Sequence, residues 1–238
     1  MMARMKLGQI VATRGVVGLM RENNDFAAFV HRAFQRYLRA DWGELCESDR
    51  KQNDRALAHG GDRIKRLRTV DDPAFAPAMA LYAASFPEHE QRLEPSQRRI
   101  MAHEQYHFGI LHDEEGFAGL ALFWDAGAYL YVEHLCISPA RRGQGLGTAA
   151  LDLLAEAGKS VILEIDPPVD EISRRRQAFY ERAGFAANPH AHVHPPYRPE
   201  NSGHALVVMS RPRPFTKDEY AAFAAYLADV VMQDCQKP

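Results

Sequence analysis

The sequence predicts an α+β fold in which a mixed, mainly antiparallel sheet is flanked by helices. Three apolar segments that are typical of strands follow one another at residues 106–112, 116–124 and 129–137. The turns between them, 113–116 and 125–127, are rich in Asp and Gly and are typical of β-hairpins. Because such a meander is antiparallel, a purely parallel sheet is excluded.

The other elements are predicted from apolar periodicity and from helix-capping residues. Asp72 and Pro73 are typical of a helix start, Gly158 and Gly184 end two later helices, and Thr216 begins a capping box. In chain order, we expect a strand at 64–70, helices at 73–86 and from about 95, the three strands of the meander, a helix at 146–157, a strand at 161–165, a helix at 173–183, strands near 185 and at 206–209, and a C-terminal helix from 216.

We expect three parts along the chain: a helical N-terminal module at 1–62, the α+β domain at 63–211 and the C-terminal helix within 212–238. The net charge of −2 gives no basic surface for nucleic acid. Three widely spaced cysteines exclude a disulfide framework, and no apolar run is long enough for a signal peptide or a membrane span. The composition therefore predicts a soluble cytoplasmic protein.

One segment, ISPARRGQGLG, combines a strand end, a turn with proline, two arginines and a helix start. Its alternate glycines, Gly143, Gly145 and Gly147, allow the backbone to come close to a ligand. A helix N-terminus offers unpaired N–H donors and a partial positive charge. With Arg141 and Arg142 at its entrance, the segment predicts a site for a pyrophosphate.

A dinucleotide-binding fold is the alternative for this segment. Gly145, Gly147 and Ala150 fit the G-x-G-x-x-A pattern, and Asp166 follows the next strand. In that fold, however, the first glycine directly follows the strand, whereas seven residues separate Ile137 from Gly145 here. The preceding strand also belongs to a meander, which disfavours this alternative.

Arg142, Gly145 and Gly147 occupy the positions of an Arg/Gln-x-x-Gly-x-Gly/Ala signature, and the segment resembles motif A of the GNAT superfamily of N-acetyltransferases. A second segment, AFYERAGF at 178–185, resembles motif B, which ends in Tyr-x-x-x-Gly-Phe. The order of predicted elements over residues 63–211 is also similar to that superfamily. The resemblance implies a GNAT-like fold and acetyl-CoA as the acetyl donor.

The resemblance also implies where acetyl-CoA binds. Its pyrophosphate would rest on the amides of residues 142–148, and its pantetheine arm would pair with the strand backbone at 135–137, where that strand separates from 161–165. The residues expected to bind acetyl-CoA are Leu135, Cys136, Ile137, Arg142, Gly143, Gln144, Gly145, Leu146, Gly147 and Thr148. Many relatives carry Asn where this chain has Arg175, so the contacts between that helix and the cofactor depart from the family pattern.

Two residues are predicted to be catalytic. Tyr180 lies where similar enzymes have a phenol near the CoA sulfur, able to protonate the thiolate or to hydrogen-bond to it; packing of the helix is the alternative. Glu133 is the candidate base for the acceptor amine, since strand alternation puts it on the same face as Leu135 and Ile137. Its alternatives are a water relay and a carboxylate bound to a nearby arginine.

The acceptor is expected to bind beside Glu133. Alternation puts Tyr131 on the same face and His134 on the opposite one, so His134 is discounted. Glu164, on the neighbouring strand, is a second candidate base or a ligand for a cationic substrate. The loops at 85–90 and 195–199 would form the pocket walls and supply two further substrate-binding residues, Glu88 and Tyr197. Together with Glu90, these carboxylates favour a cationic amine.

The alternating histidines at 190, 192 and 194 share one strand face, but carboxylates or cysteines that would complete a metal site are lacking nearby. No metal is therefore predicted. Residues 1–62 resemble a family of small bacterial proteins, which implies no activity and is compatible with partner binding.

The expected function is acetyl transfer from acetyl-CoA to a primary amine of a small molecule, peptide or protein, by direct attack in a ternary complex. The alternative is a non-catalytic CoA-binding regulator that acts through residues 1–62. Dimers are common among similar enzymes, which leaves a homodimer open. Fold and superfamily do not identify the acceptor.

Overall fold

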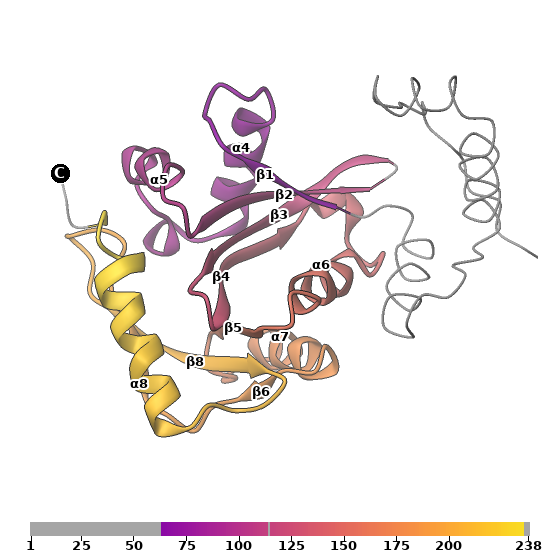
Figure 1. The fold of residues 1–238 in the computed structure, drawn as a ribbon. Helices are drawn as coiled ribbons and strands as arrows, with labels where there is room; N and C mark the ends of the chain where they lie inside the picture. Colours follow the sequence, from indigo (N-terminus) through magenta and orange to yellow (C-terminus); the bar gives the residue numbers. More distant parts are fainter. Residues whose placement is uncertain (1–62, 114, 236–238) are drawn as a thin grey trace, which may run out of the picture. The chain divides into compact units, whose positions relative to one another are not determined.

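The computed structural model describes residues 63–113 and 115–235, which form one eight-stranded sheet with helices on both faces (Figure 1). The expectations for residues 1–62 lie outside the described residues. The strands are β1 (Arg63–Leu67), β2 (Tyr106–Asp113), β3 (Gly116–Asp125), β4 (Tyr129–Ile137), β5 (Ser160–Ile165), β6 (Ala186–Ala187), β7 (His192–His194) and β8 (His204–Arg211). The helices are α4 (Phe75–Ser85), α5 (Glu94–Ile100), α6 (Leu146–Ala155), α7 (Glu171–Arg182) and α8 (Lys217–Tyr226), with short turns of helix at η1 (Glu88–Glu90), η2 (Pro139–Arg141) and η3 (Leu227–Val231).

The strand order is β1-β2-β3-β4-β5-β8-β6, and β7 pairs with β8. The β4–β5 pair is parallel, whereas the other strand pairs of the described region are antiparallel. The predicted mixed, mainly antiparallel sheet is therefore confirmed. Strand β7 was not among the strands expected in chain order, although the alternating histidines at 192 and 194 were interpreted as sharing a strand face.

Two buried apolar clusters cover the two faces of the sheet. One cluster joins the sheet to α4, α5 and α8, and the other joins it to α6 and α7 (Figure 1). Helix α8 begins at the predicted capping box, in which Thr216 and Glu219 each accept a hydrogen bond from the other's backbone N–H. None of the described helices has the length and apolar character needed to cross a membrane.

Strand β4 contains a β-bulge that the alternation pattern could not reveal. Leu122 pairs with His134 while Phe123 pairs with Val132, so Glu133 is the extra residue in β4. The bulge shifts the side-chain alternation by one residue. Tyr131 consequently packs in the α4 and α8 cluster, not on the face of Leu135 and Ile137 as predicted.

The bulge also coincides with the point where β4 leaves β5. The parallel pairing runs only from Tyr129–Ser160 to Val132–Leu163. Beyond Val132, the β4 backbone remains paired with β3 but has no pairing with β5. The predicted separation of the two strands is present, and the functional cavity lies there.

Docking of α8 should contribute strongly to stability. Phe223 is fully buried, with its ring centroid 5.3 Å from that of Tyr131 and 6.1 Å from that of Tyr129. We expect Phe223→Ala to lower the free energy of unfolding by about 3–5 kcal/mol, since it leaves a cavity under the helix. Urea denaturation checks this, with the exposed Lys217→Ala on the same helix as control. Equal stability of the two variants would show that α8 is not docked as described.

Candidate active site

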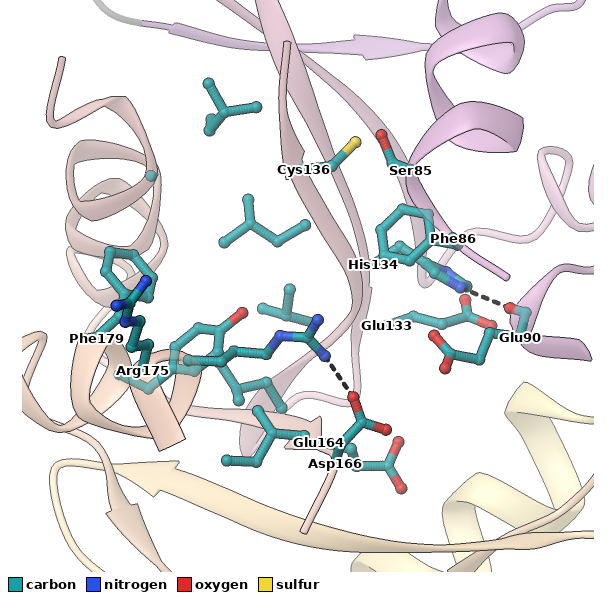
Figure 2. A pocket seen from close by; sticks show the side chains of 18 of the residues that line it. Ser85, Phe86, Glu90, Glu133, His134, Cys136, Glu164, Asp166, Arg175 and Phe179 are labelled. Carbon is teal, nitrogen blue, oxygen red and sulfur yellow. Dashed lines mark hydrogen bonds and ion pairs between the residues drawn. The ribbon is translucent and has the colours of Figure 1, made fainter. Parts of the chain in front are cut away.

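A cavity of about 730 Å³ lies where β4 and β5 separate (Figure 2). One side is formed by the glycine-rich segment before α6 and by α7. The other side is formed by the loop after α4, by the bulged part of β4 and by residues near β7 and β8. The lining side chains and backbone come from residues 85–87, 90, 132–137, 141–143, 145–148, 163–166, 175, 176, 179, 180, 194, 197, 204 and 206.

The glycine-rich segment forms a cradle of free amides. Gly143 and Gly145 adopt positive φ of 78° and 80°, a conformation that favours glycine, and α6 begins immediately after Gly145. Within the described part of the chain, the amides of residues 143–148 have no backbone acceptor. The amide of Arg142 instead closes a turn on the Pro139 carbonyl at 3.4 Å. The cradle therefore begins at Gly143, one residue later than expected.

The two arginines at the cradle differ in their partners. Arg141 is paired with Asp113 and with Glu115, the latter at 3.3 Å. The Arg142 side chain donates to the Ile137 carbonyl at 3.3 Å and has no ion pair among the described residues. The guanidinium of Arg142 therefore keeps its charge for an anion bound at the cradle.

The open edge of β4 lies between the cradle and the other side of the cavity. Leu135, Cys136 and Ile137 line the cavity, and their backbone faces the gap left by β5. The Cys136 side chain is buried in the core beside Ser85 (Figure 2), and burial raises the pKa of its thiol. The side chain of Cys136 thus belongs to the core, and its backbone lies along the open edge of β4.

Tyr180 of α7 lines the cavity. Its ring centroid lies 5.0 Å from that of Phe179 and 5.9 Å from that of Phe185, so it also packs α7 on the sheet. Burial raises the pKa of the Tyr180 phenol, which keeps the hydroxyl protonated at neutral pH. A protonated phenol can donate to a ligand in the cavity.

Glu133 lies at the bulge with its side chain fully buried in an ion pair. Arg92 donates to its Oε1 from Nε at 2.8 Å and from Nη2 at 2.7 Å, and Trp124 Nε1 donates to its Oε2 at 2.9 Å. Burial alone would raise the pKa of Glu133, but Arg92 and its other partners lower it below the ordinary value. This arrangement is the arginine-bound carboxylate named above as the alternative to a base.

Arg92 extends this ion pair to the C-terminal segment. Its guanidinium also donates to the Val231 carbonyl at 2.7 Å and to the Cys235 sulfur. The Trp124 and Tyr197 rings lie 5.8 and 5.4 Å from it. Sequence analysis missed Arg92, because no local pattern predicts a partner 41 residues away.

Two predicted acceptor residues do not line the cavity. Tyr131 is buried behind it and donates a hydrogen bond to Glu164, because the bulge turned it to the other face. Glu88 is exposed and is paired with Arg198, an ion pair that joins the two loops predicted to form the walls. Glu90, from the same loop, lines the cavity in its place.

Histidines that the sequence analysis discounted or left unassigned line the same side as Tyr197. His134 has its Nε2 2.9 Å from the Glu90 carbonyl (Figure 2). The His194 and His204 ring centroids are 6.0 Å apart, and Tyr197 lies 4.7 Å from His194 and 5.7 Å from His134. We name these residues, with Phe86 and Glu90, the acceptor end of the cavity.

Glu164 lies beneath the acceptor end. It accepts hydrogen bonds from Tyr131 and His192, and its Oε2 is 3.7 Å from Nε2 of His194. Burial alone would raise the pKa of Glu164, but His194, His192 and Tyr131 lower it. Sequence analysis found no carboxylate near the histidines at 190, 192 and 194. In the folded chain, strand β5 supplies one, Glu164.

Comparisons with known proteins agree with this fold. Residues 75–185 match the model of the acetyltransferase (GNAT) family. The Bacillus subtilis (strain 168) protein named "Putative acetyltransferase YjbC" is 34% identical over 79 residues, which are 32% of this chain and 41% of that protein. A solved structure from Bacteroides thetaiotaomicron, described as "Putative acetyltransferase from GNAT family", is 27% identical, with a TM-score of 0.67 over 71% of this chain and 98% of that one.

Removing one partner of the buried Arg92–Glu133 pair should destabilise the protein. Arg92→Met leaves an uncompensated buried carboxylate, and we expect a loss of about 3–5 kcal/mol in urea denaturation. The double variant Arg92→Met/Glu133→Gln should lose less, because no buried charge remains. Arg98→Met removes an exposed i,i+4 pair with Glu94 and should cost about 0.5 kcal/mol or less. A single variant as stable as Arg98→Met would contradict the ion pair.

Proposed function

We propose that residues 75–185, which match the model of the acetyltransferase (GNAT) family, form an acetyltransferase domain, and that the protein transfers the acetyl group of acetyl-CoA directly to a primary amine. The observation that supports this most is the coincidence of three features in one cavity. These are the free amides at 143–148, the open β4 edge and the protonated Tyr180.

The cradle fits the pyrophosphate of acetyl-CoA by its chemistry. Six consecutive N–H groups at a helix N-terminus favour an anion, and the unpaired Arg142 adds a full positive charge. A side chain at Gly147 would come within 3.3 Å of the Phe179 ring, so the glycine also lets α6 and α7 pack closely. If the disfavoured dinucleotide alternative held, the cradle would bind NADH instead of acetyl-CoA.

The β4 edge would align the donor. The pantetheine amides can pair with the backbone of Leu135 and Ile137, which β5 leaves open. The thioester would then lie between Tyr180 and the acceptor end, close to the amine. Holding both reactants in one cavity supplies much of the rate, since direct transfer needs no covalent enzyme intermediate.

The chemistry requires a proton to leave the amine and one to reach the sulfur. Tyr180 is our candidate for donating a hydrogen bond or a proton to the leaving thiolate. Of the two carboxylates considered as base, Glu133 has both oxygens bonded, which favours a positioning role for it over proton transfer. The acidic groups Glu90, Glu164 and Asp166 in the cavity wall support a cationic amine as the acceptor.

Acetyl-CoA binding tests the proposal directly. We expect the wild-type protein to bind acetyl-CoA and not NADH in isothermal titration calorimetry. Arg142→Ala should weaken acetyl-CoA binding about ten- to a hundred-fold, the loss of one charge-assisted contact. Arg174→Ala removes a nearby arginine that does not line the cavity and should leave binding unchanged. Absence of acetyl-CoA binding by the wild type would overturn the proposal, and NADH binding would revive the dinucleotide alternative.

Replacing the Tyr180 hydroxyl should separate chemistry from binding. We expect Tyr180→Phe to bind acetyl-CoA as the wild type does and to release CoA about a hundred-fold more slowly with an amine acceptor such as ethylamine. Tyr226→Phe, at a tyrosine that does not line the cavity, serves as the matched control. Unchanged turnover in Tyr180→Phe would leave Tyr180 with packing as its role.

A further inference from the structure

Three buried imidazole nitrogens at the acceptor end have no hydrogen-bond partner in the described part of the chain. They are Nδ1 of His134, Nε2 of His194 and Nε2 of His204. All three residues line the cavity, and His134 and His194 are 4% and 1% exposed. A buried polar atom without a hydrogen bond is costly, so these atoms point to a ligand that supplies N–H donors. A primary amine has that chemistry.

His194 differs from the other two because its second nitrogen defines the tautomer. Its Nδ1 lies 2.5 Å from the Pro195 carbonyl, which only accepts a hydrogen bond. The neutral ring therefore carries its proton on Nδ1 and a lone pair on Nε2. Nε2 lies 3.7 Å from Glu164 Oε2, so a proton taken up there would form an ion pair with a buried carboxylate.

We propose that His194, supported by Glu164, accepts the proton of the acceptor amine; this inference rests on the proposed function. The amine nitrogen attacks the thioester carbonyl carbon, the new C–N bond forms and the C–S bond breaks. The amine proton passes to Nε2 of His194, and the CoA thiolate leaves and takes a proton from Tyr180 or from solvent. The products are the amide and CoA. The imidazolium returns its proton to solvent, and Tyr180, where it was the donor, regains a proton from solvent.

The surroundings distinguish His194 from the other candidate bases. Glu133 is held by Arg92, and no ion pair joins His204 to a carboxylate of residues 63–113 or 115–235. Burial lowers the pKa of His134 and of His204, which keeps both rings neutral and able to accept hydrogen bonds from the amine. His194 thus combines an unpaired nitrogen with a carboxylate that stabilises the protonated ring.

The charge state of His194 depends on groups from several elements. Those that face it or share its cluster are Glu164 of β5, His192 of β7, His204 of β8, His134 of β4, and Tyr197 from the loop after β7. Glu164 stabilises the protonated ring, while the neighbouring imidazoles oppose a second positive charge. Glu164 is therefore a positioning residue and His194 the catalytic one.

The test compares His194→Gln and Glu164→Gln with a control, His190→Gln. His190 precedes β7, stacks on Tyr220 and does not line the cavity. Calorimetry with acetyl-CoA first establishes that each variant is folded and binds the donor. We then expect CoA release with ethylamine to fall about 10²- to 10⁴-fold in His194→Gln, less in Glu164→Gln, and not in the control.

The pH dependence provides a readout that a merely structural role would not change. With 2,2,2-trifluoroethylamine, an amine that is uncharged at neutral pH, the wild-type rate should fall as acid protonates Nε2. The rate of His194→Gln should keep only the pH dependence that protonation of the amine itself causes. An unchanged rate and pH profile in a variant that still binds acetyl-CoA would overturn the role of His194 alone, whereas absence of acetyl-CoA binding in the wild type would overturn the proposed function.

A measurement without turnover decides the matter if neither probe amine is acetylated. Histidine-selective ¹⁵N NMR, assigned by comparison with His194→Gln, reports which ring nitrogen carries the proton. We expect neutral His194 as the Nδ1–H tautomer, with Nε2 changing on titration. A neutral ring protonated at Nε2, or a ring that does not titrate, would overturn the proposal.

Discussion

The buried ion pair between Arg92 and Glu133 is the interaction on which the cavity depends. An isolated charge in a protein interior is very costly, so each side chain needs the other in place. Arg92 also bonds to Val231 and Cys235, while Glu133 accepts from Trp124. One pair therefore links the segment before α5, the bulge of β4, strand β3 and the C-terminal segment, and Glu133 of this pair lines the cavity.

The bulge at Glu133 explains where the sequence analysis was wrong about β4. The strand and the meander were predicted, because apolar runs and turn residues are local signals. The separation from β5 was implied by the family resemblance. Alternation assumes a regular strand, so one extra residue exchanged the faces on the C-terminal side of the bulge. Tyr131 therefore lies on the opposite face from Leu135 and Ile137. The discounted His134 shares the face of Tyr131, where its ring contacts Tyr82 and Phe86, and it nevertheless lines the cavity.

The two sides of the cavity differed in how far the sequence predicted them. The cradle is one contiguous segment, and its glycines, arginines and helix start predicted it from the sequence. The exception is the Arg142 amide, which was expected in the cradle but closes a turn. The acceptor end is assembled from β4, β7, β8 and the loops at 85–90 and 195–199, with Glu164 of β5 beneath it, and these side chains meet only in the folded chain. Glu164 and His192 are 28 residues apart, and no spacing rule joins them.

The fold gives its two buried carboxylates different environments. Glu133 is balanced by a guanidinium, which is charged at any accessible pH, so the pair is a permanent structural element. Glu164 interacts with imidazoles and a phenol, so the net charge of the groups around it changes when an imidazole gains a proton. A proton that moves from an amine to His194 creates an ion pair between His194 and Glu164. A proton that moved to Glu133 would instead remove the ion pair between Glu133 and Arg92. This difference favours the Glu164 side of the cavity for proton transfer.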